Sequence, residues 1–298
     1  VRKHRVRSAP RAARSRAADR RAVLREFAQP RWHGETLGGR ALLLQPEQDI
    51  GDTIQFLRFA ALLAARGEKI VLGVQAELAR VAAWLHGPGI TIVPPNVAVP
   101  DFAARTPIMS VPAVLRTQLD ELTATVPYLT VPPALVAQWR ARMESGTALR
   151  VGLVWSADQT GRAGQRRSLA FDDLAPVLAV PGVHFVLLQA PPAAIAQAQF
   201  VDLSPALGDL ADTAAAIAAL DLLIAVESTA LHLAGAMGNL AWAVLGPDAD
   251  WRWMASRVTT AWYPSLQLFR SSRDGATAES IPQIAELLHR LVPSADPR

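Results

Sequence analysis

The chain has 298 residues, 51% of them hydrophobic, which is enough apolar surface for one large core or two modest ones, and we expect two domains. No apolar run reaches the roughly 18 to 20 residues that a transmembrane helix needs, because charges or prolines interrupt every candidate, so we expect a soluble protein. The absence of cysteine excludes disulfides, thiolate nucleophiles and cysteine-ligated zinc, and it suits a cytoplasmic location.

Basic residues are concentrated at the start of the chain. Residues 1–25 contain ten Lys or Arg and a single acidic residue, Asp19, so the net charge of +4 belongs to this arm and the remainder is mildly acidic. Such an arm can contact nucleic acid or anionic lipid, but it has no aromatic residues between its arginines, and we expect no specific nucleic-acid partner. We interpret residues 1–35 as a basic extension, disordered or truncated, and leave open a peripheral contact with the inner face of the membrane.

From residue 40, short apolar runs alternate with helical stretches. The sequence predicts strands at 41–45, 69–74 and 89–93 and helices at 53–65 and 75–85. Alternation of strand and helix implies a parallel sheet with right-handed crossovers. The proline-rich segment 126–133 looks extended and free of helix, which makes it the expected linker between an N-terminal domain of residues 36–131 and a C-terminal domain of residues 132–298.

The same alternation restarts after the linker. The sequence predicts strands at 149–155, 183–189, 200–203, 221–226 and 240–245, helices at 134–144, 171–178, 209–220 and 228–237, and a polar loop at 156–167. This order implies a doubly wound sheet. In such sheets ligands bind beyond the carboxyl ends of the strands, where the strand order reverses, so we expect the chemistry in the loops between strands and helices.

The first such loop, residues 46–53, reads PEQDIGDT and lies between the first expected strand and helix. Gly51 permits close backbone approach, Asp52 can cap the helix, and the positive end of the helix favours an anion. Glu47 and Asp52 would both lie near the ligand, next to Gln48, and either carboxylate could accept a proton from an acceptor hydroxyl. The alternative is that Asp52 is an ordinary helix N-cap.

The second loop follows the apolar run LLIAV, and residues 227–236 read ESTALHLAGA. A helix that begins at Ser228 or Thr229 would direct backbone N–H groups and hydroxyls at a phosphate, with Glu227 directly before it. His232 lies on the same helix face one turn later and could donate to a diphosphate. The alternative is a structural histidine, with the Ala-Gly-Ala that follows it serving tight packing of the helix on the sheet.

Arginines and aromatic residues supply two further candidates. Arg162, Arg166 and Arg167 fall in the polar loop after a strand and could neutralise a leaving diphosphate, or they form a solvated basic loop. Residues 250–253 (DWRW) and 262–264 (WYP) bring aromatic faces that suit either sugar stacking or interdomain packing. The sequence has no DxD-type metal pair in a suggestive position, no zinc spacing and no GxGxxG loop, so we expect chemistry that needs neither metal nor cofactor.

Together these segments resemble the glycosyltransferase-like domain of bacterial tetratricopeptide-repeat proteins. That domain is related to the lipopolysaccharide heptosyltransferases of glycosyltransferase family 9 and, more distantly, to O-linked N-acetylglucosamine transferases. The resemblance runs from about residue 27 to residue 291, and it is carried by the blocks QPRWHGETLGGRALLL, EQDIGDTIQFLRF, LRVGLVWS, LGDLADTAAAIAALDLLIAVESTALHLAGAMG, DWRW and WYPSLQLFR. It implies an α/β fold of the GT-B type, in which two Rossmann-like domains face each other across a cleft. The N-terminal half would hold the acceptor and the C-terminal half the nucleotide sugar.

The resemblance also implies roles for single residues. Asp52 matches the position proposed as the general base, and His232 matches a contact to the donor diphosphate, so we count both as candidate catalytic residues. The positions that match the donor site are Gln189, Glu227, Ser228, Thr229, Arg167 and Ser168. The positions that match the cleft and its acceptor side are Glu47, Gln48, Gly51, Asp250, Trp251 and Arg252.

The sequence departs from the family pattern at several places. Asp49 replaces the first glycine of the usual Glu-Gln-Gly-Leu-Gly-Asp, Glu227 replaces an aspartate, and residues 238–240 read Gly-Asn-Leu in place of Gly-Lys-Pro. No repeat with a period near 34 residues is visible. The leading hypothesis is an inverting, metal-independent glycosyltransferase that moves a sugar from a nucleoside diphosphate donor to a glycan or protein acceptor. The departures keep open a non-catalytic nucleotide- or carbohydrate-binding module in surface polysaccharide assembly, whereas a dehydrogenase is disfavoured by the missing glycine fingerprint.

Overall fold

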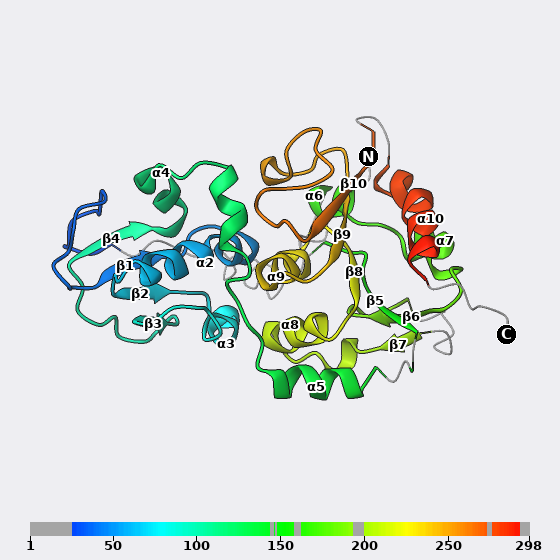
Figure 1. Ribbon diagram of the computed structural model, residues 1–298, viewed down its shortest axis with the longest axis horizontal. Helices are drawn as coiled ribbons and strands as arrows, with labels where there is room; N and C mark the ends of the chain where they lie inside the picture. The colour runs from blue at the N-terminus through cyan, green and yellow to red at the C-terminus, as the bar shows by residue number, and fades with distance from the viewer. Residues whose placement is uncertain are drawn as a thin grey trace, which may run out of the picture. The chain divides into compact units, whose positions relative to one another are not determined.

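The computed structural model describes residues 26–143, 146, 148–157, 162–192, 200–272 and 276–292 (Figure 1). The chain forms two compact units. The first contains the described residues up to Ala79 together with Gly87–Leu115, and the second contains Arg80–His86 together with the described residues from Arg116 onward. None of the helices in these ranges combines the length and the apolar character that crossing a membrane requires.

The first unit is built on a parallel sheet of four strands in the order β3-β2-β1-β4. Leu43 is in register with Val71 of β2 on one side and with Arg105 of β4 on the other. All four residues of β1 are buried, as expected for a parallel strand covered on both faces. The predicted parallel sheet is therefore confirmed. Its strands are β1 (Leu42–Gln45), β2 (Ile70–Gly73), β3 (Ile90–Val93) and β4 (Ala104–Pro107).

The longest helix of this unit, α2 (Ile50–Ala65), directly follows β1 and buries eleven of its sixteen residues. It begins three residues before the predicted helix, because Asp49 and not Asp52 is its N-cap. The predicted helix at 75–85 is shorter than expected and starts as a 3-10 turn. The remaining elements are η1 (Ala76–Leu78), α3 (Ala79–Ala82), η2 (Ile108–Ser110) and α4 (Val111–Leu115).

The segment before β1 packs on the same sheet. Phe27 meets Phe102 edge to face, with 5.1 Å between the ring centroids, and Phe102 belongs to a buried cluster with Leu43 and Val71. Trp32 is only 3% exposed, and its backbone N–H donates to the carbonyl of Arg105 in β4. The part of the predicted extension from residue 27 to residue 32 thus contributes to the core of the first unit, while residues 1–25 lie outside the described residues.

The second unit contains a six-stranded sheet in the order β10-β9-β8-β5-β6-β7, and all neighbouring strands are parallel. The chain builds outward from β5 to β7 on one side and from β8 to β10 on the other. The strand order therefore reverses between β5 and β8, and the predicted doubly wound sheet is confirmed. The strands are β5 (Leu149–Val154), β6 (Val183–Leu187), β7 (Phe200–Asp202), β8 (Leu222–Val226), β9 (Ala241–Leu245) and β10 (Leu266–Arg270).

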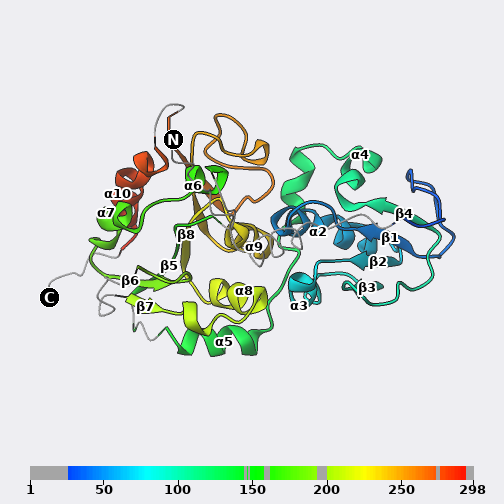
Figure 2. The same ribbon diagram turned by 180° about the vertical axis from the view of Figure 1, so that it is seen from behind.

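Helices cover both faces of this second sheet. In Figures 1 and 2, α8 and α9 lie on one face with α5 beside α8, and α7 and α10 lie on the other. The longer elements are α5 (Pro133–Ala141), α6 (Arg162–Arg167), α7 (Ala175–Leu178), α8 (Leu210–Ala218), α9 (Thr229–Met237) and α10 (Ile281–Leu291). Short 3-10 turns are η3 (Asp120–Thr125), η4 (Phe171–Leu174), η6 (Ser204–Ala206), η7 (Trp251–Trp253) and η8 (Thr277–Ser280).

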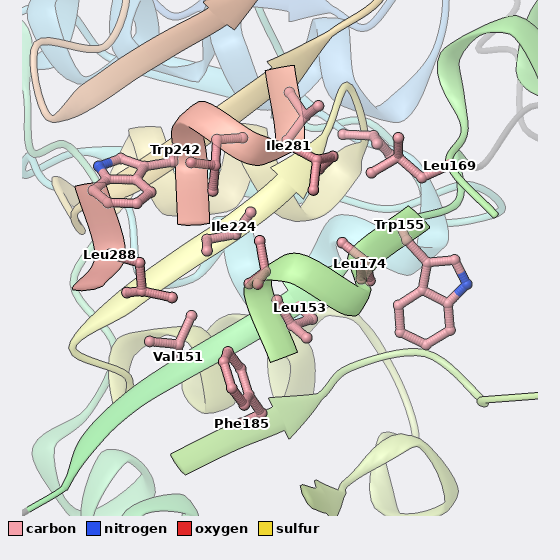
Figure 3. Close-up of a cluster of buried hydrophobic side chains, with 14 of the residues drawn as sticks. Val151, Leu153, Trp155, Leu169, Leu174, Phe185, Ile224, Trp242, Ile281 and Leu288 are labelled. Atoms are coloured by element: carbon pink, nitrogen blue, oxygen red, sulfur yellow. The ribbon is translucent and has the colours of Figure 1, made fainter. Parts of the chain in front are cut away.

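The core of the second unit lies between its sheet and the α7–α10 layer (Figure 3). Leu153 of β5 and Ile224 of β8 point from the central strands toward Leu174, Ile281 and related apolar side chains. The facing helices keep these side chains out of water. The faces of the sheet are therefore covered, and the loops at the carboxyl ends of the strands are left for chemistry.

Several elements differ from the prediction. The polar loop expected at 156–167 ends in a helix, α6. The strands β4 and β10 and the helix α10 were not predicted. β4 reads Ala-Arg-Thr-Pro and has no apolar run of its own; it is a strand because its backbone pairs with β1 over Leu42–Gln45.

Candidate functional site

Both sheets reverse their strand order next to a predicted motif. In the first unit the reversal lies between β1 and β4, and the loop after β1 carries residues 46–49. In the second unit it lies between β5 and β8, and β8 runs directly into Glu227 and Ser228. Because ligands of doubly wound folds bind beyond the carboxyl ends of the strands at such reversals, each motif lies where a ligand site is expected in its own sheet.

In the second unit the turn between β8 and α9 presents a helix N-terminus. Ser228 is the N-cap of α9 with extended backbone angles, and Thr229 is the first helical residue. The Ser228 side chain is buried, and among the described residues its hydroxyl has no hydrogen-bond partner. The first N–H groups of a helix have no partner within the helix and attract anions. This turn can therefore bind a phosphate group.

Glu227, the residue before the N-cap, is surrounded by arginines. Its Oε1 lies 3.3 Å from Nη1 of Arg167 and 4.0 Å from Nη1 of Arg252, and the residue is only 7% exposed. Arg252 also lies 3.4 Å from Oδ2 of Asp250. Burial raises the pKa of Glu227 above its ordinary value, and the guanidinium of Arg167 opposes that rise. Carboxylates and guanidinium groups therefore alternate in a compact cluster beside the α9 N-terminus.

Arg166 and Arg167, the two loop arginines whose side chains the structure describes, have different surroundings. Arg167 faces Glu227, and its side chain is 21% exposed. Arg166 is exposed and pairs with Asp248 through Nε at 2.9 Å. The side chain of Arg162 and residues 158–161 lie outside the described part of the chain, so the prediction for this half of the loop stays a prediction.

Two predicted donor-site residues hold the backbone of the β5–α6 connection. The Gln189 side chain accepts the N–H groups of Trp155 and Ser156 at 3.0 and 2.9 Å and donates to the carbonyl of Ser156 at 2.7 Å. The Ser168 hydroxyl accepts the N–H of Ala157 and donates to the carbonyl of residue 164. These bonds shape the loop at the carboxyl end of β5, and direct contact of either side chain with a donor stays a prediction.

His232 is buried in an aromatic cluster. Its Nδ1 lies 2.9 Å from the hydroxyl of Tyr263, its ring centroid is 5.6 Å from that of Trp253, and it is 4% exposed. A side chain at Gly235 would collide with the Tyr263 ring, because a Cβ there would lie 2.3 Å from Cγ. Tyr263 and Trp253 thus hold the imidazole one turn behind Ser228. Sequence reasoning placed these two residues in aromatic segments but did not connect them with His232.

The predicted residues of the DWRW segment come together beside Glu227. Asp250 caps η7 by accepting the N–H of Arg252, and its own N–H points to Oε2 of Glu227 at 3.5 Å. Trp251 is 56% exposed, packs edge to face on Trp262, and has the Arg252 guanidinium 5.4 Å from its ring centroid. The segment therefore joins a buried charge cluster to an exposed indole.

In the first unit, Asp52 is not the N-cap of its helix. Asp49 is the N-cap of α2, and Oδ2 of Asp52 accepts the N–H of Asp49 at 3.2 Å. Asp52 is thus the third helical residue of a capping box and is 7% exposed, so the interpretation of Asp52 as N-cap is wrong. Gly51 is in the first turn, and Gln48 has a positive φ of 60° in the turn before the helix.

Glu47 is the second carboxylate of this loop. Its Oε1 accepts the N–H of Met109, which follows β4, at 3.0 Å. Burial raises the pKa of Glu47, whereas the hydrogen bond from Met109 and the charge of Arg31 lower it, and the charge of Asp52 adds to the rise. The charge of Asp52 therefore acts on Glu47 at the reversal of the first sheet. Among the described residues there is no group of three or more side chains suited to hold a metal ion.

No family model matches the chain. Its fold is similar to that of the E. coli ADP-heptose lipopolysaccharide heptosyltransferase II, with a TM-score of 0.57 and 16% identity over 85% of this chain and 98% of that one. It is also similar to the glycosyl transferase family 9 protein of Veillonella parvula DSM 2008, with a TM-score of 0.54 and 14% identity over 87% of this chain and 99% of that one. A third structure, E. coli heptosyltransferase WaaC with ADP-2-deoxy-2-fluoro heptose, gives a TM-score of 0.54 and 12% identity over 84% and 99%.

Among curated proteins, the chain is 27% identical over 289 residues to Protein FlbA of Caulobacter vibrioides (strain ATCC 19089 / CIP 103742 / CB 15). The match covers 87% of this chain and 48% of FlbA, so the chain spans about half the length of that relative. The solved structures are all below 25% identity and establish the fold. The chain thus has an α/β fold with two sheets, each made of parallel strands. This fold matches the heptosyltransferases of glycosyltransferase family 9.

Proposed function

We propose that the chain is an inverting, metal-independent glycosyltransferase that moves a sugar from a nucleoside diphosphate to a glycan or protein acceptor. One observation carries the proposal: in a fold that matches heptosyltransferases, the polar motif of each sheet lies at the point where its strand order reverses. In this proposal residues 132–298 bind the nucleotide sugar, residues 36–131 bind the acceptor, and the two form a GT-B arrangement.

The second unit would stabilise the leaving diphosphate. The N-terminus of α9 and the Ser228 hydroxyl offer hydrogen-bond donors to phosphate oxygens, with Thr229 in the first turn. Arg167 is partly exposed at the same place and can pair with two phosphate oxygens. His232, which Tyr263 holds one turn further along α9, would lie behind this group. Donors fixed before the reaction stabilise charge that develops on a leaving group.

The first unit would supply the general base. In a single displacement the acceptor oxygen bonds to the anomeric carbon while the bond from that carbon to the diphosphate breaks, and configuration inverts. The acceptor proton goes to a carboxylate at the start of α2, for which the family resemblance points to Asp52. Glu47 lies in the loop before that helix, and the charge of Asp52 adds to the rise in the pKa of Glu47. Exchanging Asp52 for Asn should lower turnover without unfolding the chain, and an unchanged rate would remove Asp52 from the mechanism.

A thermal-shift screen of the full chain against UDP, GDP, ADP, CDP and dTDP tests the donor site first. A nucleotide at one hundred times its dissociation constant should stabilise the chain by about 2.7 kcal/mol. Arg167→Ala should weaken that nucleotide about tenfold or more, because a charge-assisted hydrogen bond is lost. Arg166→Ala is the matched control, since Arg166 pairs with Asp248 instead. If no nucleotide stabilises the chain, the proposed function is wrong.

A non-catalytic binding module remains the second candidate, and one observation favours it. The carboxylate of Glu227 already lies within 3.3 Å of Arg167 and 4.0 Å of Arg252, so it competes with a phosphate for both cations. Release of free nucleoside diphosphate from the matching nucleotide sugar separates the two candidates. Nucleotide binding without sugar transfer or donor hydrolysis supports the module, and turnover supports the enzyme.

A further inference from the structure

Trp251 is an unusual tryptophan in this chain. The sequence has eight tryptophans, all in described positions, and six of them are buried while Trp84 is intermediate. Trp251 alone is more than half exposed, at 56%. Burial of an aromatic side chain of this size away from water is favourable. An indole left in water beside a candidate site is therefore a surface available for a ligand.

The indole also packs against neighbouring side chains. Its ring stands edge to face on Trp262, with 5.7 Å between the centroids and an interplanar angle of 81°. The next residues, Arg252 and Trp253, are buried, and Trp253 is fully enclosed. Asp250 caps the turn from the other side by accepting the N–H of Arg252. Contacts with Trp262 and Arg252 restrict the rotamers of Trp251, so the side chain has less conformational entropy to lose when a ligand stacks on it.

The polar groups beside the indole define what kind of ring fits. The Arg252 guanidinium lies 5.4 Å from the centroid of the indole and 3.4 Å from the Asp250 carboxylate, whose side chain is 24% exposed. Arg252 also faces Glu227, which in turn pairs with Arg167. A carboxylate accepts hydrogen bonds from hydroxyl groups, and a guanidinium donates to hydroxyl oxygens. A flat apolar face next to such groups matches a sugar ring, which presents C–H groups on one face and hydroxyls at its edge. The negative charge of Asp250 disfavours a phosphate directly on the indole, whereas the hydroxyls of a neutral sugar can donate to it.

We infer that Trp251, with Asp250 beside it, forms a subsite for a saccharide ring next to the α9 turn. The ring belongs either to the sugar of the nucleotide donor or to a separate glycan, and the chemistry that binds it is the same. The first assignment rests on the proposed function. The second does not, because a carbohydrate-binding module would use the same surface.

The test compares the wild-type chain with Trp251→Ala and Trp251→Phe. Leu240→Ala is the matched control, because Leu240 is an exposed apolar residue at the opposite, amino end of β9. One arm measures by calorimetry the dissociation constants of ADP, UDP and GDP and of ADP-glucose, UDP-N-acetylglucosamine and GDP-mannose. The other arm measures retention on an array of immobilised glycans. Near-ultraviolet circular dichroism checks that each variant is folded.

If the subsite binds the donor sugar, Trp251→Ala should weaken the nucleotide sugar about tenfold and leave the nucleoside diphosphate unchanged. If it binds the acceptor, Trp251→Ala should abolish glycan retention and leave both nucleotide constants unchanged. Trp251→Phe should restore part of the loss in either arm, and Leu240→Ala should change neither.

Failure of this inference and failure of the proposed function give different results. Glycan retention that depends on Trp251, with no nucleotide bound, supports the subsite and contradicts the glycosyltransferase. Equal weakening of nucleotide and nucleotide sugar by Trp251→Ala places the indole on the nucleotide and overturns the inference. It is also overturned if no saccharide or nucleotide sugar is bound, or if Trp251→Ala binds every probe as the wild type does.

Discussion

Gly235 lies inside α9 against the ring of Tyr263, and we predict that Gly235→Ala destabilises the chain although alanine favours helices. A Cβ built at Gly235 would lie 2.3 Å from Cγ and 2.4 Å from Cδ1 of Tyr263. Tyr263 is fully buried, and its hydroxyl lies 2.9 Å from Nδ1 of His232. The ring therefore cannot move aside without disturbing neighbouring side chains and this hydrogen bond.

The magnitude follows from three terms. Overpacking in a core costs about 1–3 kcal/mol. Loss of the bond between Tyr263 and His232 adds about 1 kcal/mol. Replacing glycine by alanine in a helix returns about 1 kcal/mol. The free energy of unfolding should fall by about 1–3 kcal/mol, which corresponds to about 2–4 °C in Tm for each kcal/mol in a unit of this size.

The assay is urea denaturation followed by far-ultraviolet circular dichroism, with Gly235→Ala made in two backgrounds. In the wild type it should destabilise. In a Tyr263→Ala background the obstacle is gone, so Gly235→Ala should stabilise by roughly 0.5–1 kcal/mol through helix propensity alone. A loss of the same size in both backgrounds would refute the steric argument, because the substitution would then act without Tyr263.

Two further predictions concern Asp49 and Glu227, the carboxylates directly before Ile50 of α2 and before the N-cap of α9. Asp49→Ala should lower the free energy of unfolding by about 1 kcal/mol, because it removes the N-cap of α2, and urea denaturation that shows no loss would contradict this role. Burial raises the pKa of Glu227 above 4.5, so the wild type should lose stability as the pH rises from that value through the raised pKa. Glu227→Gln removes this loss, and Tm curves of the two proteins that run parallel from acid to neutral pH would show that Glu227 does not titrate as described.

The sequence predicted the regions in which chemistry-bearing residues follow an apolar strand. The run LLIAV reads as a buried strand because β-branched and long apolar residues fill it, and Ser228 reads as a helix cap because its hydroxyl suits that position. The structure agrees, with β8 at Leu222–Val226 and α9 from Thr229. Local signals of this kind depend on residues a few positions apart, which the sequence shows directly.

Contacts between distant residues could not be predicted in the same way. Arg167 and Glu227 are far apart along the chain and lie 3.3 Å apart in the fold. β4 has an arginine and ends at a proline, and only its pairing with β1 makes it a strand. Asp49 at the cap of α2 was visible as a departure from the family pattern, yet its role depended on where the helix begins. For the ion pair and for β4, tertiary pairing and not local propensity decides the outcome, whereas for Asp49 the register of the helix start decides it.

The length of the Glu227 side chain determines how the two arginines beside the α9 turn are compensated. In the family that the sequence resembles, an aspartate precedes the helix, and a glutamate reaches one methylene further. Here its Oε1 comes within 3.3 Å of Arg167 and 4.0 Å of Arg252, so the positive charge of this cluster is largely compensated by the protein itself. A buried guanidinium without a partner is costly, and Glu227 together with Asp250 removes that cost. A phosphate at the α9 turn then has to share Arg167 with Glu227, which should make its affinity rise when Glu227 is protonated or replaced by glutamine.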